Sequence, residues 1–267
     1  MAEFSTVIEA VSRQAGDFLY AFQEDLKVQE KGSDLDFVTN ADLQSQALIR
    51  RLLKEAFPSH LFIGEEDGIP DKEIARRLYQ DHDSYFWIVD PLDGTQNYIK
   101  HLGGYAVSMS LFHDGQTLVG CSYIPSEKEL FLAVKGEGAY LNGKRLHVSD
   151  TATIRHSLLN TGIPTVNQEF RKTMVDIISR IAMDSLNMRI IGSAARSLGL
   201  TAEGSFEIYF ELGPHPWDVG AGKLLVEEAG GKVTNFEGTP YRYGDDGVVA
   251  TNGLIHEELM SYWRDNA

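Results

Sequence analysis

The sequence contains a single cysteine, Cys121, so no disulfide can form within the chain. This cysteine usage is typical of a reducing compartment. Cys121 lies in the apolar stretch VGCSYI, which favours a small buried side chain over a nucleophile. With one cysteine and no paired histidine motif, the chain is not expected to hold a structural zinc ion.

Long apolar runs are missing as well. No stretch approaches the roughly 20 apolar residues that a membrane-spanning helix needs. Residues 1–18 carry charges at helical spacing, in place of the apolar centre of a signal peptide. We therefore expect a soluble, cytoplasmic protein that has no membrane partner.

Basic side chains are few. The chain has 24 Lys and Arg against 39 Asp and Glu, which gives a formal net charge of −15. Nucleic acids are bound through patches of Lys and Arg, so nucleic acid is not expected as a general partner. A small phosphorylated ligand remains compatible with this charge, because metal cations can lie between acidic side chains and an anion.

Residues 1–150 predict an α+β half. Apolar side chains recur at helical spacing from Phe4 to Phe22, and a second helix follows Thr39 or Asn40, either of which can cap it. The stretches HLFIGEE and SYFWIVD predict strands. The stretches that follow predict a meander-like antiparallel sheet, in which HDGQ and Asn142-Gly143 form hairpin turns.

The order of the predicted elements changes after residue 150, and residues 151–267 predict an α/β half. Helical patterns at 169–183, 194–204 and 219–230 alternate with apolar runs at 188–192, 207–212, 232–236 and 248–252. The sequence has no internal repeat, low-complexity tract or flexible linker, so both halves are expected to pack as one compact unit.

Acidic residues gather at the predicted ends of elements. In WIVDPLDGTQNY (87–98), Asp90 and Asp93 flank a proline where a buried strand is expected to end at Asp90. Glu65 and Glu66 close another strand, and Asp218 begins a helix. Taken singly, each aspartate could be an ordinary turn or cap residue. Together they indicate ligands that a rigid scaffold presents to one cavity.

Such a set of carboxylates predicts a Mg²⁺ site. Clustered carboxylates repel each other unless divalent cations neutralise them, and Mg²⁺ prefers hard oxygen ligands. Pro91 is expected to bend the chain between Asp90 and Asp93, so that the Leu92 carbonyl can join the metal ligands. If a helix begins after Gly94, the free N–H groups of Gly94 and Thr95 can also bind a phosphate.

The sequence resembles the inositol monophosphatase family of Mg²⁺-dependent, lithium-sensitive phosphatases. Five motifs carry this resemblance in the family's order and span most of the chain: DFVTNAD (36–42), GEE (64–66), DPLDGTQN (90–97), WDVGAG (217–222) and EAGG (228–231). The resemblance implies a layered α-β-α-β-α sandwich, hydrolysis of a phosphomonoester and a homodimer.

The resemblance also implies roles for single residues. Two to three Mg²⁺ ions per subunit are expected, and the ligands matched in this sequence are Glu65, Asp90, the Leu92 carbonyl, Asp93 and Asp218. Thr95, paired with Asp42, and Glu65 are expected to take part in activating a water molecule for in-line attack. Substrate contacts are expected from Asp93, Gly94, Thr95, Ala194 and Glu211.

Several assignments stay open at this stage. Asp42 could simply cap a helix, and Glu66 could support Glu65 or face solvent. Lys31 and Arg196 could assist the site or lie on the surface, and His215 has no assigned chemistry. The favoured substrate is inositol monophosphate. The alternatives are 3′-phosphoadenosine 5′-phosphate, fructose 1,6-bisphosphate and, outside catalysis, a binding protein of the same fold.

Overall fold

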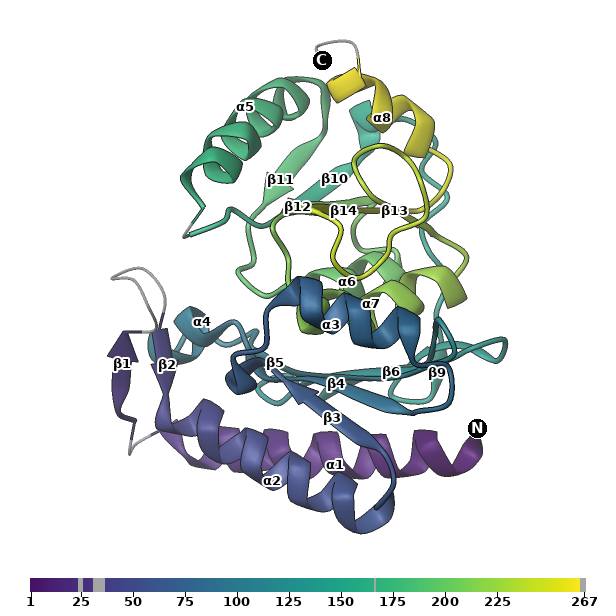
Figure 1. The fold of residues 1–267 in the computed structure, drawn as a ribbon. Coiled ribbons are helices and arrows are strands. Elements are labelled where there is room, and N and C mark those ends of the chain that lie inside the picture. Colours follow the sequence, from purple (N-terminus) through teal and green to yellow (C-terminus); the bar gives the residue numbers. More distant parts are fainter. Residues whose placement is uncertain (24–25, 31–36, 166, 265–267) are drawn as a thin grey trace.

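Helices and sheets alternate in five layers, as Figure 1 shows. The computed structural model describes residues 1–23, 26–30, 37–165 and 167–264. From one side to the other, the layers are α1 and α2, a first sheet, a middle layer of α3, α6 and α7, a second sheet, and α5 with α8. The layered α-β-α-β-α prediction is confirmed.

The elements have the following bounds. The helices are α1 (Ala2–Ala21), α2 (Asn40–Ala56), α3 (Asp71–Gln80), α4 (Thr95–Ile99), α5 (Gln168–Asp184), α6 (Ala194–Glu203), α7 (Pro216–Glu228) and α8 (His256–Arg264), with short 3₁₀ helices η2 (Glu65–Asp67) and η3 (Ile154–His156). The strands are β1 (Val28–Glu30), β2 (Phe37–Thr39), β3 (Leu61–Gly64), β4 (Phe86–Asp93), β5 (Ala106–His113), β6 (Gln116–Ile124), β7 (Glu129–Val134), β8 (Gly138–Leu141), β9 (Lys144–Arg145), β10 (Leu158–Thr161), β11 (Asn187–Arg189), β12 (Ile208–Leu212), β13 (Lys232–Thr234) and β14 (Gly247–Thr251).

The two large sheets differ in topology. The first has the order β3-β4-β5-β6-β7-β8-β9; β3 runs parallel to β4, and every later pair is antiparallel. The second has the order β11-β10-β12-β14-β13; β10 runs parallel to both neighbours, and β14 runs antiparallel to β12 and β13. The expected antiparallel meander and the α/β character of the second half are both present.

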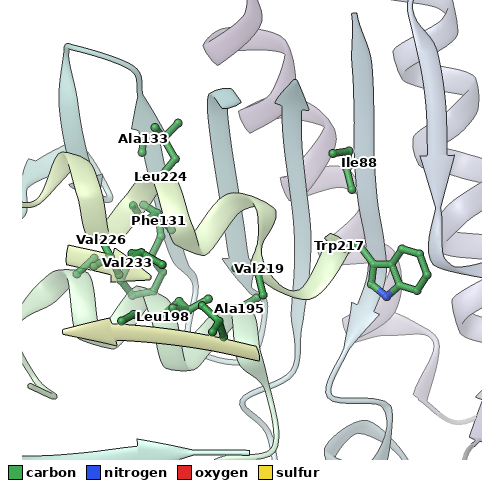
Figure 2. Packing of buried hydrophobic residues seen from close by; sticks show 14 of the residues in the cluster. Ile88, Phe131, Ala133, Ala195, Leu198, Trp217, Val219, Leu224, Val226 and Val233 are labelled. Atoms are coloured by element: carbon green, nitrogen blue, oxygen red, sulfur yellow. The ribbon is translucent and has the colours of Figure 1, made fainter. Parts of the chain in front are cut away.

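Strand β4 shows how the first sheet contributes side chains to two hydrophobic cores. Side chains alternate between the faces of a strand. Phe86 and Ile88 therefore join the core that contains α6 and α7, whereas Trp87 and Val89 join the core beneath α1 and α2. Figure 2 shows the first of these cores, with Ile88 near Trp217 of α7. Both faces of β4 are buried, so its position in the sheet is fixed from two sides.

Helix α7 lies close against the first sheet because glycines leave room for it. A Cβ atom on Gly120 of β6 would lie 2.8 Å from the Ala221 carbonyl oxygen, closer than real Cβ atoms come. On α7 itself, a Cβ on Gly222 would lie 2.3 Å from Leu198 of α6. These contacts fix α7, and with it Asp218, against the first sheet and against α6.

The sequence predicted some elements differently. Strand β4 does not end at Asp90 but continues to Asp93, with an irregular register between these residues. Pro91 has no N–H to give to the neighbouring strand, which accounts for a local break in pairing rather than a strand end. Strand β11 ends at Arg189 rather than extending to residue 192. Strand β10 and helix α8 had not been predicted.

Two smaller expectations can be checked directly. Cys121 is buried and free, as expected for a residue inside a strand. No helix in the described part of the chain is long and apolar enough to cross a membrane.

Candidate active site

A cavity of about 880 Å³ opens where the layers meet. Most of the residues predicted to form a site line it: Glu65, Asp90, Leu92, Asp93, Gly94, Thr95, Ala194, Glu211 and Asp218. They come from β4, η2, the first turns of α4, α6 and α7, and the end of β12. Residues that are more than 100 positions apart in the sequence therefore share one space.

Three of the aspartates converge closely. One carboxylate oxygen from each of Asp90, Asp93 and Asp218 lies within 4.8 Å of the other two. Strand β4 supplies the first two on either side of its irregular step. Asp218 lies in the first turn of α7, where its carboxylate accepts a hydrogen bond of 2.8 Å from the His215 backbone N–H. These three belong to the predicted acidic set, of which Glu65 lies outside the group of three.

The negative charges of this cluster favour the binding of a cation. Burial raises the pKa of Asp90 and Asp218 well above the usual range, and neighbouring negative charges raise both further. Glu65 is one of these neighbours, although it lies outside the group of three. Hard carboxylate oxygens with mutual repulsion fit a divalent cation such as Mg²⁺. The residues present can therefore hold a metal ion.

Asp93 also joins the first sheet to the middle layer. Its carboxylate accepts hydrogen bonds from the Ser193 hydroxyl, from the Ala195 N–H at 2.8 Å and from the Ala194 N–H at 3.3 Å. Burial raises the Asp93 pKa to about 6 against the opposing effect of these bonds. Ser193 caps α6 and had not been predicted, although it directly precedes Ala194, which was predicted as a substrate contact.

Thr95 and Asp42 are in contact. The Thr95 hydroxyl lies 3.3 Å from Asp42 Oδ1 and 3.1 Å from the Leu92 carbonyl oxygen, and either can accept its hydrogen. Asp42 also forms a capping box with Thr39 at the start of α2. Burial raises the pKa of Asp42 to about 6. Asp42 is thus a helix-cap residue and, at the same time, a neighbour of the predicted catalytic threonine.

Gly94 makes the turn that leads into α4. Its φ of 85° lies in the left-handed region, which favours glycine. A Cβ there would also come within 3.0 Å of the Gly192 carbonyl oxygen. Helix α4 begins at Thr95, so the condition stated for a phosphate contact is met, and the helix is short. The phosphate contact of Gly94 and Thr95 stays a prediction.

Glu211 lies on the cavity wall, at the end of β12. Burial raises its pKa to about 7, and a hydrogen bond from the Tyr209 hydroxyl opposes the rise. Tyr209 had not been predicted as a site residue. Glu211 is not in the group that could hold a metal, which is compatible with a role towards the substrate.

His215 lies on the cavity rim and contacts acidic residues. Its ring nitrogen Nδ1 lies 2.9 Å from Asp71 Oδ2, and its ring stacks on Trp217. Burial lowers the His215 pKa, but Asp71 and Asp218 outweigh this effect and raise it to about 9. His215 therefore adds a positive charge to the rim of a predominantly acidic cavity.

The remaining open positions lie as follows. Arg196 forms an ion pair with Glu127, with 2.6 Å between the charged atoms, and it does not line the cavity. The Glu66 backbone N–H donates to Gln46 Oε1 at 3.0 Å. Lys31 and Asp36 lie outside the described residues.

Comparison with known proteins decides the family. The model of the inositol monophosphatase family matches residues 1–266. The chain belongs to this family. The resemblance inferred from the sequence motifs is confirmed.

Individual members of the family are similar over nearly the whole chain. A curated Nus factor SuhB from Salmonella typhimurium is 36% identical over 263 residues, covering 97% of this chain and 95% of the relative. The crystal structure of the extragenic suppressor protein SuhB from Bartonella henselae has a TM-score of 0.88 at 30% identity and 98% coverage of both chains. An inositol monophosphatase from Anabaena has a TM-score of 0.83 at 33% identity, covering 98% of this chain and 95% of its own.

The names of the curated relatives correct one expectation about this inositol monophosphatase family member. Relatives from Salmonella typhimurium, Escherichia coli and Vibrio cholerae are each named Nus factor SuhB. A Nus factor takes part in transcription, so these names contradict the prediction that nucleic acid is not a general partner, and that prediction was wrong. A net charge describes the whole chain, and it does not report on local patches or on partners that bind elsewhere on the surface.

Proposed function

We propose that this protein is a Mg²⁺-dependent phosphomonoesterase whose substrate is inositol monophosphate. One observation carries the proposal: three convergent aspartates share a cavity with Glu211 and with Thr95, whose hydroxyl contacts the buried Asp42. Family membership supports the same reaction class. Inhibition by Li⁺ and the presence of two to three Mg²⁺ ions are parts of this proposal.

The metal ligands are Asp90, Asp93 and Asp218, together with Glu65 and the Leu92 carbonyl. When bound, Mg²⁺ supplies Lewis-acid stabilisation of the phosphoryl charge and acidifies a water molecule. The protein contributes the rigid placement of these oxygens, because Asp93 is held by three donors from α6 and Asp218 by the start of α7.

Thr95 and Asp42 move the proton. A water molecule hydrogen-bonded to the Thr95 hydroxyl can pass its proton to Thr95 while Thr95 passes its own to Asp42 Oδ1, 3.3 Å away. An acid whose pKa is raised to about 6 accepts a proton near neutral pH more readily than an ordinary aspartate does. A hydroxyl has one hydrogen, so the Leu92 carbonyl competes with Asp42 for this bond.

Glu211 recognises the alcohol part of the substrate. An ionised carboxylate accepts hydrogen bonds and can take two from adjacent hydroxyls of a polyol. Glu211 lines the same cavity as the aspartates but is not in their group of three, so the phosphate can lie at the metal ligands while the ring lies against Glu211. A substrate without neighbouring hydroxyls loses this interaction.

A substrate panel tests the proposal. Initial rates with Mg²⁺ are measured for inositol 1-phosphate, 3′-phosphoadenosine 5′-phosphate, fructose 1,6-bisphosphate and p-nitrophenyl phosphate. We expect the highest kcat/KM for inositol 1-phosphate. A higher value for either alternative biological substrate would reassign the specificity, and no hydrolysis of any of the four would point to a binding protein.

The relatives' names support a second candidate function, a role as a Nus factor. Such a role depends on the outer surface and does not require the acidic cavity. If it includes direct contact with RNA, labelled single-stranded RNA should bind wild-type protein and the Asp93→Asn variant equally in fluorescence anisotropy. No binding by wild type in the micromolar range would contradict direct RNA contact.

A further inference from the structure

Tyr209 and Glu211 lie on the same face of β12, two residues apart. The intervening Phe210 points to the opposite core, beneath α5 and α8, as alternation along a strand requires. Tyr209 is 1% exposed and is one of the residues that line the cavity. Its hydroxyl donates a hydrogen bond to Glu211 Oε2. A buried phenol therefore contacts the carboxylate that is proposed to bind the substrate.

Gly162 provides the space in which this carboxylate lies. It follows β10, whose Thr161 pairs with Phe210, so Gly162 lies beside Glu211. A Cβ on Gly162 would be 2.1 Å from Glu211 Oε1 and 2.6 Å from Oε2, both too close for real atoms. The carboxylate thus lies directly against the Gly162 backbone, in a space that an alanine would fill.

No hydrogen bond other than the one from Tyr209 reaches the Glu211 carboxylate from the described residues. Burial raises the pKa of Tyr209 well above its usual range, and the charge of Glu211 adds to the effect, so the phenol keeps its proton and remains a donor. A glutamate side chain has several rotatable bonds, and ordering it when substrate binds would weaken binding. Because the Tyr209 hydroxyl already orders the Glu211 side chain, substrate binding does not have to order it.

We propose that Tyr209 is a positioning residue that, together with the gap at Gly162, holds Glu211 in the orientation that selects polyol phosphates. The inference rests on the proposed function, because it assigns Glu211 to the substrate hydroxyls. It adds a determinant of specificity that does not itself need to touch the substrate.

The first test compares two substrates in Tyr209→Phe, which removes only the hydroxyl. A hydrogen bond of this kind contributes roughly twofold to tenfold in an equilibrium. We expect KM for inositol 1-phosphate to rise by about that factor at nearly unchanged kcat, and kcat/KM for p-nitrophenyl phosphate to change less than about twofold. In a Glu211→Ala background, where Tyr209 has no side-chain acceptor at position 211, Tyr209→Phe should add little further loss, because Tyr209 acts through the Glu211 carboxylate.

Tyr241→Phe is the matched control. Tyr241 is also buried, and its hydroxyl has no hydrogen-bond partner among the described residues. Its loss should leave the ratio of the two substrates unchanged. Equal losses on both substrates in Tyr209→Phe, or a full additional loss in the Glu211→Ala background, would assign Tyr209 a general structural role and overturn the inference.

A second variant and a second readout keep the outcome independent of turnover. Gly162→Ala adds a methyl group where Glu211 lies; the backbone of Gly162 is not in the left-handed region, so alanine fits its backbone conformation and the Glu211 side chain must move. Crystal structures of both variants should show the Glu211 carboxylate displaced from its present position. An unmoved carboxylate in both would overturn the inference. Absence of wild-type turnover on every substrate would instead refute the proposed function.

Discussion

Three carboxylate side chains in the cavity are largely buried and also lie close to other negative charges. Asp90, Asp93 and Asp218 have raised pKa values because burial and mutual repulsion both disfavour the charged form. Such a cluster costs folding free energy in the absence of a cation. Hydrogen bonds from the start of α6 and from the start of α7 hold Asp93 and Asp218 in place. A role of these oxygens as metal ligands explains why the carboxylates converge despite this cost.

Asp93→Asn tests the ligand set directly. Asparagine keeps the size of the side chain but removes one charged oxygen, so we expect a loss of kcat/KM beyond the roughly 10–100-fold seen for outer partners of metal ligands. Asp246→Asn is the matched control, since Asp246 lies on the cavity lip outside the group of three. Steady-state kinetics together with a thermal melt are the measurements. Near-normal turnover in Asp93→Asn would remove Asp93 from the ligands.

Glu211→Gln should change the pH dependence of stability. The Glu211 pKa is raised by burial to about 7 from an ordinary value of 4.5, so between these pH values the folded state keeps a proton that the unfolded state has released. The free energy of unfolding therefore falls as pH rises through this window. Glutamine retains an acceptor for Tyr209 and has no such charge.

The expected result is that Glu211→Gln stabilises the metal-free protein at pH 8 by about 1–3 kcal/mol and has little effect at pH 4. Urea unfolding in EDTA at both pH values measures this difference. A variant that is less stable than wild type at pH 8 would show that the Glu211 charge is compensated in the folded state.

Helix α2 connects a local sequence signal to the site. Thr39 is 1% exposed; its hydroxyl accepts a hydrogen bond of 3.1 Å from the Ala41 N–H and donates to Asp42. The capping box thus fixes the side chain that also contacts Thr95. One threonine supports both the helix and the proposed proton acceptor.

Thr39→Ala should therefore have two effects. Loss of an N-cap costs about 0.5–2 kcal/mol of stability. We also expect a lower kcat, because the Asp42 carboxylate loses the Thr39 hydroxyl that holds it. Thr39→Ser keeps the hydroxyl and should restore most of both properties. Chemical unfolding and kcat for the three proteins measure the effects. Equal behaviour of the alanine and serine variants would show that the hydroxyl does not support α2 or Asp42.

The elements that could be predicted are those with strong local signals. Helix α2 has a cap and a regular apolar face, and β5 and β6 flank a turn sequence. Strand β10 is four residues long and lacks such a signal. Pro91 suggested a strand end, but pairing with β5 resumes at Asp93. Long-range packing decided these cases, and local sequence does not report it.

The same distinction applies to the site. Asp90, Asp93 and Asp218 could be predicted because aspartates at element ends, in a known family pattern, carry their own signal. Ser193 and Tyr209 could not be assigned, because their importance lies in a contact with another side chain. The spacing of Tyr209 and Glu211 on one strand face was visible in the sequence, but Gly162, the third member, comes from another strand.

In the whole molecule, the cavity exists only where the layers meet. Asp90 and Asp93 come from the first sheet, Asp218 and the donors to Asp93 from the middle layer, and Glu211 from the second sheet. The core around α6 and α7 contains side chains from both sides of residue 150. The division into halves at this position stays a prediction, and so does the homodimer implied by the resemblance.

The dependence of inositol 1-phosphate hydrolysis on Mg²⁺ tests the central claim most directly. Phosphate release is measured with EDTA-treated protein and again as Mg²⁺ is titrated back, with Asp93→Asn as the paired sample. The account predicts no turnover in EDTA, restoration by Mg²⁺ in wild type, and at most a small recovery in Asp93→Asn. Full turnover in EDTA, or equal restoration in both proteins, would contradict it.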